Sequence, residues 1–231
     1  MVERGLRPAS LTSGAVAILA TADPAAKASA SRRLAEIWDA GELDVGSSAT
    51  PPRPARPARP LLRRPKEMPK RRAFGSPAGR IALLHALAHI ELNAIDLAWD
   101  IVARFSHEPL PRAFFDDWVG VGADEALHFE LLVHRLADFG AYYGDLPAHD
   151  GLWESAVATA DDLLARLAVV PLVLEARGLD VTPEMAATLE RVGDSESAAV
   201  LCRIYCDEID HVAAGVRWFD ELCRARGLIP E

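Results

Sequence analysis

Apolar residues recur every three or four positions through most of the chain after residue 76, and the strict apolar–polar alternation of strands is absent. Ser76-Pro77 supplies an N-cap followed by a first-turn proline, and glycine or proline follows each later stretch. The pattern predicts four long helices and one short helix. They cover about Ser76 to Phe105, Arg112 to Phe139, Leu152 to Arg177, a short segment from Thr182-Pro183, and Asp194 to Arg226.

A long connection rich in Gly, Pro and Tyr separates the second long helix from the third. Four long helices with such a crossover are typical of a ferritin-like four-helix bundle, so we expect an all-α fold. Upstream, Asp23-Pro24 starts a further helix with an apolar stripe. We therefore divide the chain into an N-terminal helical appendage (1–45), an extended Pro/Arg-rich strap (46–75) and the bundle (76–231).

The strap is strongly basic, whereas the whole chain carries a net charge of −9. Between Arg53 and Arg72 there are nine basic residues and one acidic residue, and residues 51–69 hold seven of the sixteen prolines. Clustered arginine and lysine can dock nucleic acid through its phosphates. The alternative is that the strap lies across the acidic remainder of its own molecule or of a partner subunit. The absence of interleaved aromatic residues, which would stack on bases, favours this alternative.

Polar residues interrupt the apolar faces of the long helices at matching places. Two helices carry a Glu and a His three residues apart, which puts both side chains on one helix face. The other two long helices each contribute a single Glu to an otherwise apolar or small-residue face. One Glu from each of two helices plus Glu-x-x-His from each of the others is the ligand pattern of a dinuclear metal site. The predicted ligands are Glu91, Glu125, His128, Glu175, Glu208 and His211.

Four buried carboxylates near one another require positive charge between them, because burial and mutual repulsion both disfavour ionisation. Two divalent cations would neutralise four glutamates and leave two neutral imidazoles as further ligands. Mixed oxygen and nitrogen ligation suits redox metals, so we expect two ions, Fe and/or Mn.

An aspartate precedes the glutamate of both Glu-x-x-His pairs. These residues are Asp124 and Asp207. An aspartate at this position can accept a hydrogen bond from the outer nitrogen of a ligand histidine on the opposing helix. We therefore expect Asp124 to pair with His211 and Asp207 with His128.

At these residues the sequence resembles the ferritin-like superfamily of dinuclear carboxylate proteins. His89-Ile90-Glu91, the Ala22-Asp23-Pro24 opening with Lys27, and the strap resemble the uncharacterised bacterial family called domain of unknown function four-five-five. The ligand order is also similar to that of a ferritin-like tRNA hydroxylase. The chain departs from the ligand pattern at Pro171, four residues before Glu175, where we expect a kink.

The resulting hypothesis is an Fe/Fe or Mn/Fe oxidoreductase that activates dioxygen or a peroxide and acts on a small organic substrate as a hydroxylase or oxidase. A second hypothesis is a ferroxidase or other metal-handling protein. A third is a tRNA-modifying hydroxylase that docks RNA through the strap. His85 and His89, one turn apart, could form a second metal site, although flanking or surface roles are favoured.

The remaining expectations concern location and assembly. The chain is 50% hydrophobic but has no uninterrupted apolar run of the length that a membrane span needs. We expect a cytoplasmic protein with no membrane partner, and a dimer is one possible assembly.

Overall fold

The computed structural model describes residues 7–68 and 74–229, and in this part of the chain the fold is all-α, as predicted. One isolated β-bridge joins Leu62 to Ala148. The helical segments are α1 (Leu11–Leu19), α2 (Pro24–Asp39), the 3₁₀ turn η1 (Pro65–Glu67), α3 (Pro77–Arg104), α4 (Arg112–Asp138), α5 (Gly151–Ala158), α6 (Leu163–Val169), the π-helical η2 (Val170–Glu175), α7 (Ala176–Arg191) and α8 (Ser195–Ala225).

Side-chain caps fix the starts of three of these helices where the sequence predicts them. Asp23 accepts a hydrogen bond from the amide of Ala26 at the start of α2, and Ser76 accepts one from Gly79 at the start of α3. Asp194 caps α8 in the same way. Each cap satisfies an amide that has no partner inside the helix, which explains why these boundaries are readable from sequence.

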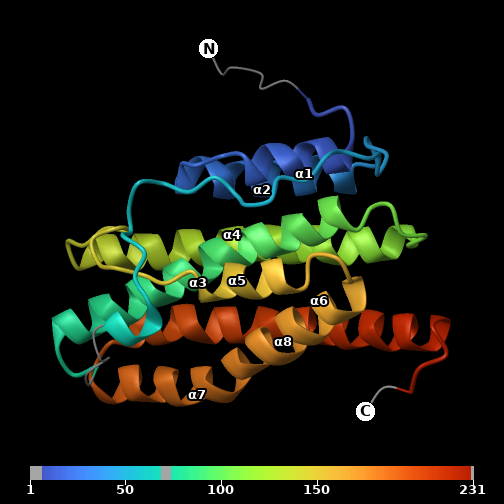
Figure 1. Cartoon of the computed structure of the whole chain (residues 1–231). Helices are drawn as coiled ribbons and strands as arrows, with labels where there is room; N and C mark the ends of the chain where they lie inside the picture. Colours follow the sequence, from blue (N-terminus) through green and yellow to red (C-terminus); the bar gives the residue numbers. More distant parts are fainter. Residues whose placement is uncertain (1–6, 69–73, 230–231) are drawn as a thin grey trace.

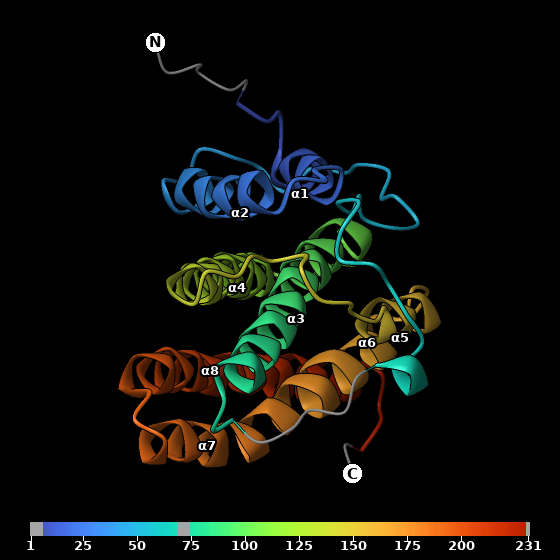
Figure 2. The ribbon, with the colours of Figure 1, turned by 90° about the vertical axis from the view of Figure 1, so that its left-hand side faces the viewer.

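The helices stack in layers (Figure 1). The pair α1 and α2 covers α3 and α4, with α1 packed on α3 and α2 on α4. On the opposite side α8 packs against α4, and α7 packs against α8; α3 crosses these layers obliquely (Figure 2). Buried residues of α1 and α2, including Leu11 and Trp38, belong to the same hydrophobic core as those of α3, α4 and α8.

The third long helix differs from its predicted form. Residues 152–177 were expected to form one helix, but α5 ends at Ala158, and α6 begins at Leu163 after Asp162 caps it. From there α6, η2 and α7 follow without a gap, so Pro183 lies inside α7 rather than starting a new helix. The expected irregularity at Pro171 is present as the π-helical η2, in which the backbone accommodates the missing amide.

Helix α3 alone among the described helices is long and apolar enough to cross a membrane by length and composition. In the structure, 72% of its most apolar window is buried against other helices. The apolar character of α3 is therefore explained by its position in the core of the fold.

The part of the strap that the structure describes lies against its own molecule. Buried Asp96 of α3 forms ion pairs with Lys27 of α2 and with Arg56 of the strap, the latter at 2.9 Å. Lys27 also donates a hydrogen bond to the carbonyl of Ala55. Arg53 forms an ion pair with Asp150 next to α5. Two of the strap's arginines are thus paired with acidic residues of the same chain.

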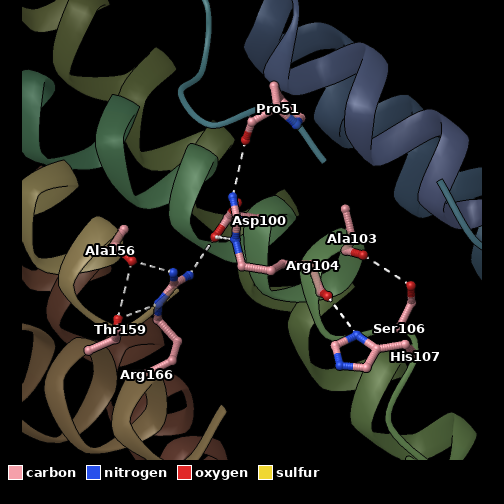
Figure 3. Close-up of polar contacts among 9 residues, drawn as sticks. All are labelled: Pro51, Asp100, Ala103, Arg104, Ser106, His107, Ala156, Thr159 and Arg166. Carbon is pink, nitrogen blue, oxygen red and sulfur yellow. Dashed lines mark hydrogen bonds and ion pairs between the residues drawn. The ribbon is translucent and has the colours of Figure 1, made fainter. Parts of the chain in front are cut away.

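A second buried network joins the strap to α3 and α6 (Figure 3). Asp100 accepts hydrogen bonds from Arg104 at 2.7 Å and from Arg166 at 2.6 Å. Arg104 donates to the carbonyl of Pro51 in the strap, and Arg166 donates to the carbonyl of Ala156 in α5. This network links the α5–α6 corner to α3, and removal of any one of its charges would leave another buried without its partner.

Candidate metal centre

Three helices bring four of the predicted ligands into one cluster beneath the surface. One ligand atom from each of the four residues lies within 4.8 Å of the others. His128 Nδ1 is 3.6 Å from Glu91 Oε2 and 3.5 Å from Glu125 Oε2. It is also 3.8 Å from Glu208 Oε1. The cluster consists of Glu91 on α3, Glu125 and His128 on α4, and Glu208 on α8.

The fifth predicted ligand, His211 on α8, lies on the other side of Glu125. Its Nδ1 is 3.3 Å from Glu125 Oε1 and 3.5 Å from Glu208 Oε2. The two oxygens of Glu125 therefore face different histidines, because Oε2 faces His128. This is the position that a carboxylate shared by two metal ions would occupy.

Glu175, the sixth predicted ligand, stands outside the tight cluster but faces the same space. It ends the π-helical η2 and lines a cavity of about 380 Å³ together with Glu91, Glu125 and Glu208. Burial, together with repulsion from Glu208 and Glu125, raises the pKa of Glu175 well above its ordinary value. The structure thus brings all four glutamates to one cavity, as their positions on the apolar helix faces predict.

Six buried side-chain atoms of the predicted ligands lack hydrogen-bond partners among the described residues. Leaving a buried polar atom unpartnered costs about 1–3 kcal/mol, and more for a charged group. Divalent cations fit this set, because each of these atoms can supply a lone pair in the direction of its neighbours. The atoms are Glu125 Oε1 and Oε2, His128 Nδ1, Glu175 Oε2, Glu208 Oε2 and His211 Nδ1.

Ionisation of the cluster is strongly perturbed when no cation balances it. Burial and the neighbouring Glu125 raise the pKa of Glu91 well above its ordinary value. Burial alone would lower the pKa of His128, but its contacts with Glu125 and Glu91 raise it to about 11. Without metal, protons would therefore provide the positive charge that the carboxylates require.

Each of the two predicted ligand histidines contacts, through its other ring nitrogen, the aspartate expected from the sequence. His128 Nε2 is 3.0 Å from Asp207 Oδ2, and His211 Nε2 is 3.2 Å from Asp124 Oδ2. Metal binding requires neutral imidazoles, and with the Nε2 hydrogen directed at a carboxylate each neutral ring would present the lone pair of Nδ1 to the metal side. Arg203 in turn donates to Asp207 at 2.6 Å, which fixes that carboxylate.

For the predicted pair of ions, replacing Asp207 by Asn is expected to leave both bound but to weaken metal affinity roughly 10- to 100-fold, because His128 loses the charged carboxylate acceptor that orients it. Competition with a chromogenic chelator measures this affinity. Asp210→Asn, at an exposed position of the same helix, is the matched control and should bind metal as the parent does. Equal affinities for the two variants would contradict the orienting role of Asp207.

A glycine on α8 allows η2 to reach the site. A Cβ atom at Gly215 would lie 2.4 Å from Pro171 Cβ and 2.6 Å from Pro171 Cγ, closer than real atoms approach. Pro171 is the second residue of η2, the segment that ends at Glu175, so the absence of a side chain at residue 215 lets η2 pack closely enough to bring that carboxylate to the cavity.

Gly215→Ala is therefore expected to push η2 outward, to destabilise the fold by about 1–3 kcal/mol and to reduce metal binding by the predicted ligand Glu175. Thermal melting and elemental analysis measure the two effects. Gly120→Ala on α4, where an added Cβ meets nothing within 4 Å, should retain both stability and metal. Full metal content in Gly215→Ala would show that metal binding does not depend on the close packing of Gly215 against Pro171.

His85 and His89 have structural partners rather than a surface role. His85 Nε2 accepts a hydrogen bond from the amide of Gly144 at 2.9 Å. His89 Nδ1 is 2.8 Å from the hydroxyl of Tyr143, and His89 Nε2 is 3.0 Å from the carbonyl oxygen of His149. Burial lowers the pKa of His89 to about 4, so this ring is neutral near pH 7. Both rings fasten the connection after α4 to α3.

The chain belongs to the family described as Protein of unknown function (DUF455), which matches residues 20–231. It is 46% identical over 174 residues to an uncharacterized protein of Haemophilus influenzae. That alignment covers 73% of this chain and 60% of the relative, so the chain spans about three fifths of that protein's length. No solved structure matches the chain.

Proposed function

We propose that the chain is a dinuclear metal oxidoreductase that uses two ions, Fe/Fe or Mn/Fe, to activate dioxygen or a peroxide and to oxidise a small organic substrate. The observation that carries this proposal is the set of unpartnered buried atoms on three glutamates and two histidines, beside a cavity that these glutamates line together with Glu91. When bound, such ions supply redox chemistry that protein side chains lack.

The glutamates and the histidines of the site lie on different sides of it. Glu91, Glu125, Glu175 and Glu208 line the cavity, whereas the two histidines are absent from its described lining and are backed by aspartates. A substrate would therefore approach from the carboxylate side, and Asp124 and Asp207 would keep the imidazoles oriented from the other side. The apolar lining of the cavity would exclude bulk water from the reacting groups.

The cavity favours an organic substrate over metal handling alone. A volume of about 380 Å³ lies within the usual range for small-molecule sites, which is roughly 300–1,000 Å³. A protein that only oxidises and passes on ferrous ions needs a polar path to its centre, and this lining is mostly apolar.

The contacts of the strap weaken the case for docking tRNA. Arg53 and Arg56 already pair with Asp150 and Asp96 of the same molecule. Phosphate contacts would make RNA binding fall steeply with salt, so a filter-binding titration with bulk tRNA at two salt concentrations tests this alternative.

Elemental analysis of protein expressed in medium supplemented with iron and manganese tests the proposed function first. We expect about two ions per chain, and oxygen consumption when the ferrous form is exposed to air. Well under one ion per chain would contradict the proposal. Multiple rapid turnovers of ferrous ion together with assembly into a cage would instead favour metal handling.

A further inference from the structure

A second cavity adjoins the one at the metal centre. It has a volume of about 650 Å³ and lies between the start of α3, the connection before α5, and η2–α7. The two cavities share four lining residues: Ile90, Leu152, Leu174 and Arg177. The shared lining shows that the two cavities are neighbours.

Apolar side chains dominate the lining of both cavities, and one positively charged side chain, Arg177, lines both of them. Among the described lining residues, Arg177 is the one arginine or lysine in either cavity. It follows Glu175 by two residues, at the start of α7, and its side chain is exposed. In the part of the chain that the structure describes, the side chain of Arg177 takes part in no hydrogen bond or ion pair.

An unpaired guanidinium at the mouth of an apolar cavity complements one kind of ligand. Its planar group binds a carboxylate or a phosphate through two parallel hydrogen bonds, which is a strong and directional contact. The apolar walls gain from covering hydrocarbon, at roughly 25 cal/mol per Å² of surface removed from water. The described lining of the two cavities offers no second arginine or lysine, so a second anionic group on the ligand would lack a cationic partner and the charge belongs at one end.

We propose that the cavities bind an elongated, mostly apolar molecule with a single anionic end group, held by Arg177. The hydrocarbon part extends along Leu152 and Leu174 toward the glutamates, while the anionic group stays at the solvent side. This inference names the substrate class of the metal centre and in that respect rests on the proposed function. The binding itself depends on Arg177 and the apolar walls.

Calorimetric titration of the protein as purified, with its metal content measured in parallel, tests this site. The probes are decanoate, decyl phosphate and 1-decanol, which share a chain and differ in the end group. We expect at least one of the two anions to bind about 10- to 100-fold more tightly than the alcohol, because a hydrogen bond to a charged group contributes about 1.5–3 kcal/mol. The preferred anion identifies the end group.

Variants of the protein distinguish the contact with the anionic end group from the contacts with the hydrocarbon part of the ligand. Arg177→Gln should remove the advantage of the anion and leave decanol binding unchanged, and Arg177→Lys should keep part of it. Arg33→Gln, an exposed arginine on α2, is the matched control and should bind as the parent does. Leu152→Trp should weaken all probes by filling the shared wall, whereas Val157→Trp on the exposed face of α5 should not.

The outcomes distinguish this site from the metal centre. Equal binding of both anions and the alcohol by the parent, or unchanged anion binding in Arg177→Gln, would overturn the inference even if two metals are present. Conversely, Arg177-dependent anion binding in protein that holds no metal would support the ligand site and contradict the proposed oxidoreductase.

Discussion

Stripping the metal ions with a chelator is expected to lower the melting temperature at pH 7 by roughly 8–16 °C per ion. This range follows because a ligand at about a thousand times its Kd stabilises the fold by about 4 kcal/mol, and each kcal/mol corresponds to roughly 2–4 °C in a chain of this size. Chelation also leaves the carboxylates of Glu91, Glu125, Glu175 and Glu208 facing one cavity without their counter-ions.

The difference between the two forms should depend on pH. In the metal-free protein, burial and neighbouring carboxylates raise the pKa values of Glu91, Glu175 and Glu208 above the ordinary 4.5. A carboxyl group whose pKa is higher in the folded than in the unfolded state binds more protons when folded, so stability falls as pH rises above about 4.5. The raised pKa of His128 adds a further loss of stability as the pH rises above 6.5.

The metal-loaded protein should show the opposite dependence, because metal binding requires ionised carboxylates and neutral imidazoles. The gap in melting temperature should therefore widen from pH 5 to pH 7.5. Differential scanning calorimetry of chelated and metal-loaded samples at both pH values measures it. Equal melting temperatures at pH 7, or a gap that does not change with pH, would mean that these carboxylates do not share metal ions.

Glu125→Gln is expected to remove at least one ion per chain and to weaken binding of the other. Its two oxygens face His211 and His128 separately, so a neutral amide removes charge from both metal positions. An amide also presents an NH₂ group, which cannot donate a lone pair to a cation. Elemental analysis and chelator competition measure the loss.

Glu130→Gln is the matched control for this variant. Glu130 lies on the same helix and pairs with Arg32 at the surface rather than with a predicted ligand. An ion pair of this exposure contributes little, so the control should keep two ions and its melting temperature. Retention of two tightly bound ions by Glu125→Gln would show that Glu125 is not shared between them.

The sequence predicts the elements whose signals are local. Ser76, Asp23 and Asp194 supply capping side chains, and they place the starts of α3, α2 and α8. Glu-x-x-His pairs on apolar faces also identify the cluster, because spacing along a helix determines which side chains share a face. The pairing of Asp207 with His128 follows from the same register.

The features that sequence reasoning misses depend on contacts between distant segments. Pro183 looks like a helix start, yet α7 continues through it, because packing of Ala186 and Leu189 on the core outweighs the lost hydrogen bond. Gly215 reads as one small residue in an apolar row, and only its approach to Pro171 reveals its role in placing η2. The sequence likewise gives no sign that Arg177 lines two cavities, because distant segments form them.

Anomalous diffraction from crystals of the protein, with data collected at the iron and manganese absorption edges, tests whether the predicted ligands hold two metal ions. We expect two anomalous peaks, one beside His128 and the other beside His211, with Glu125 between them. A cluster without anomalous density in protein grown with both metals, or peaks that lie elsewhere, would contradict this expectation.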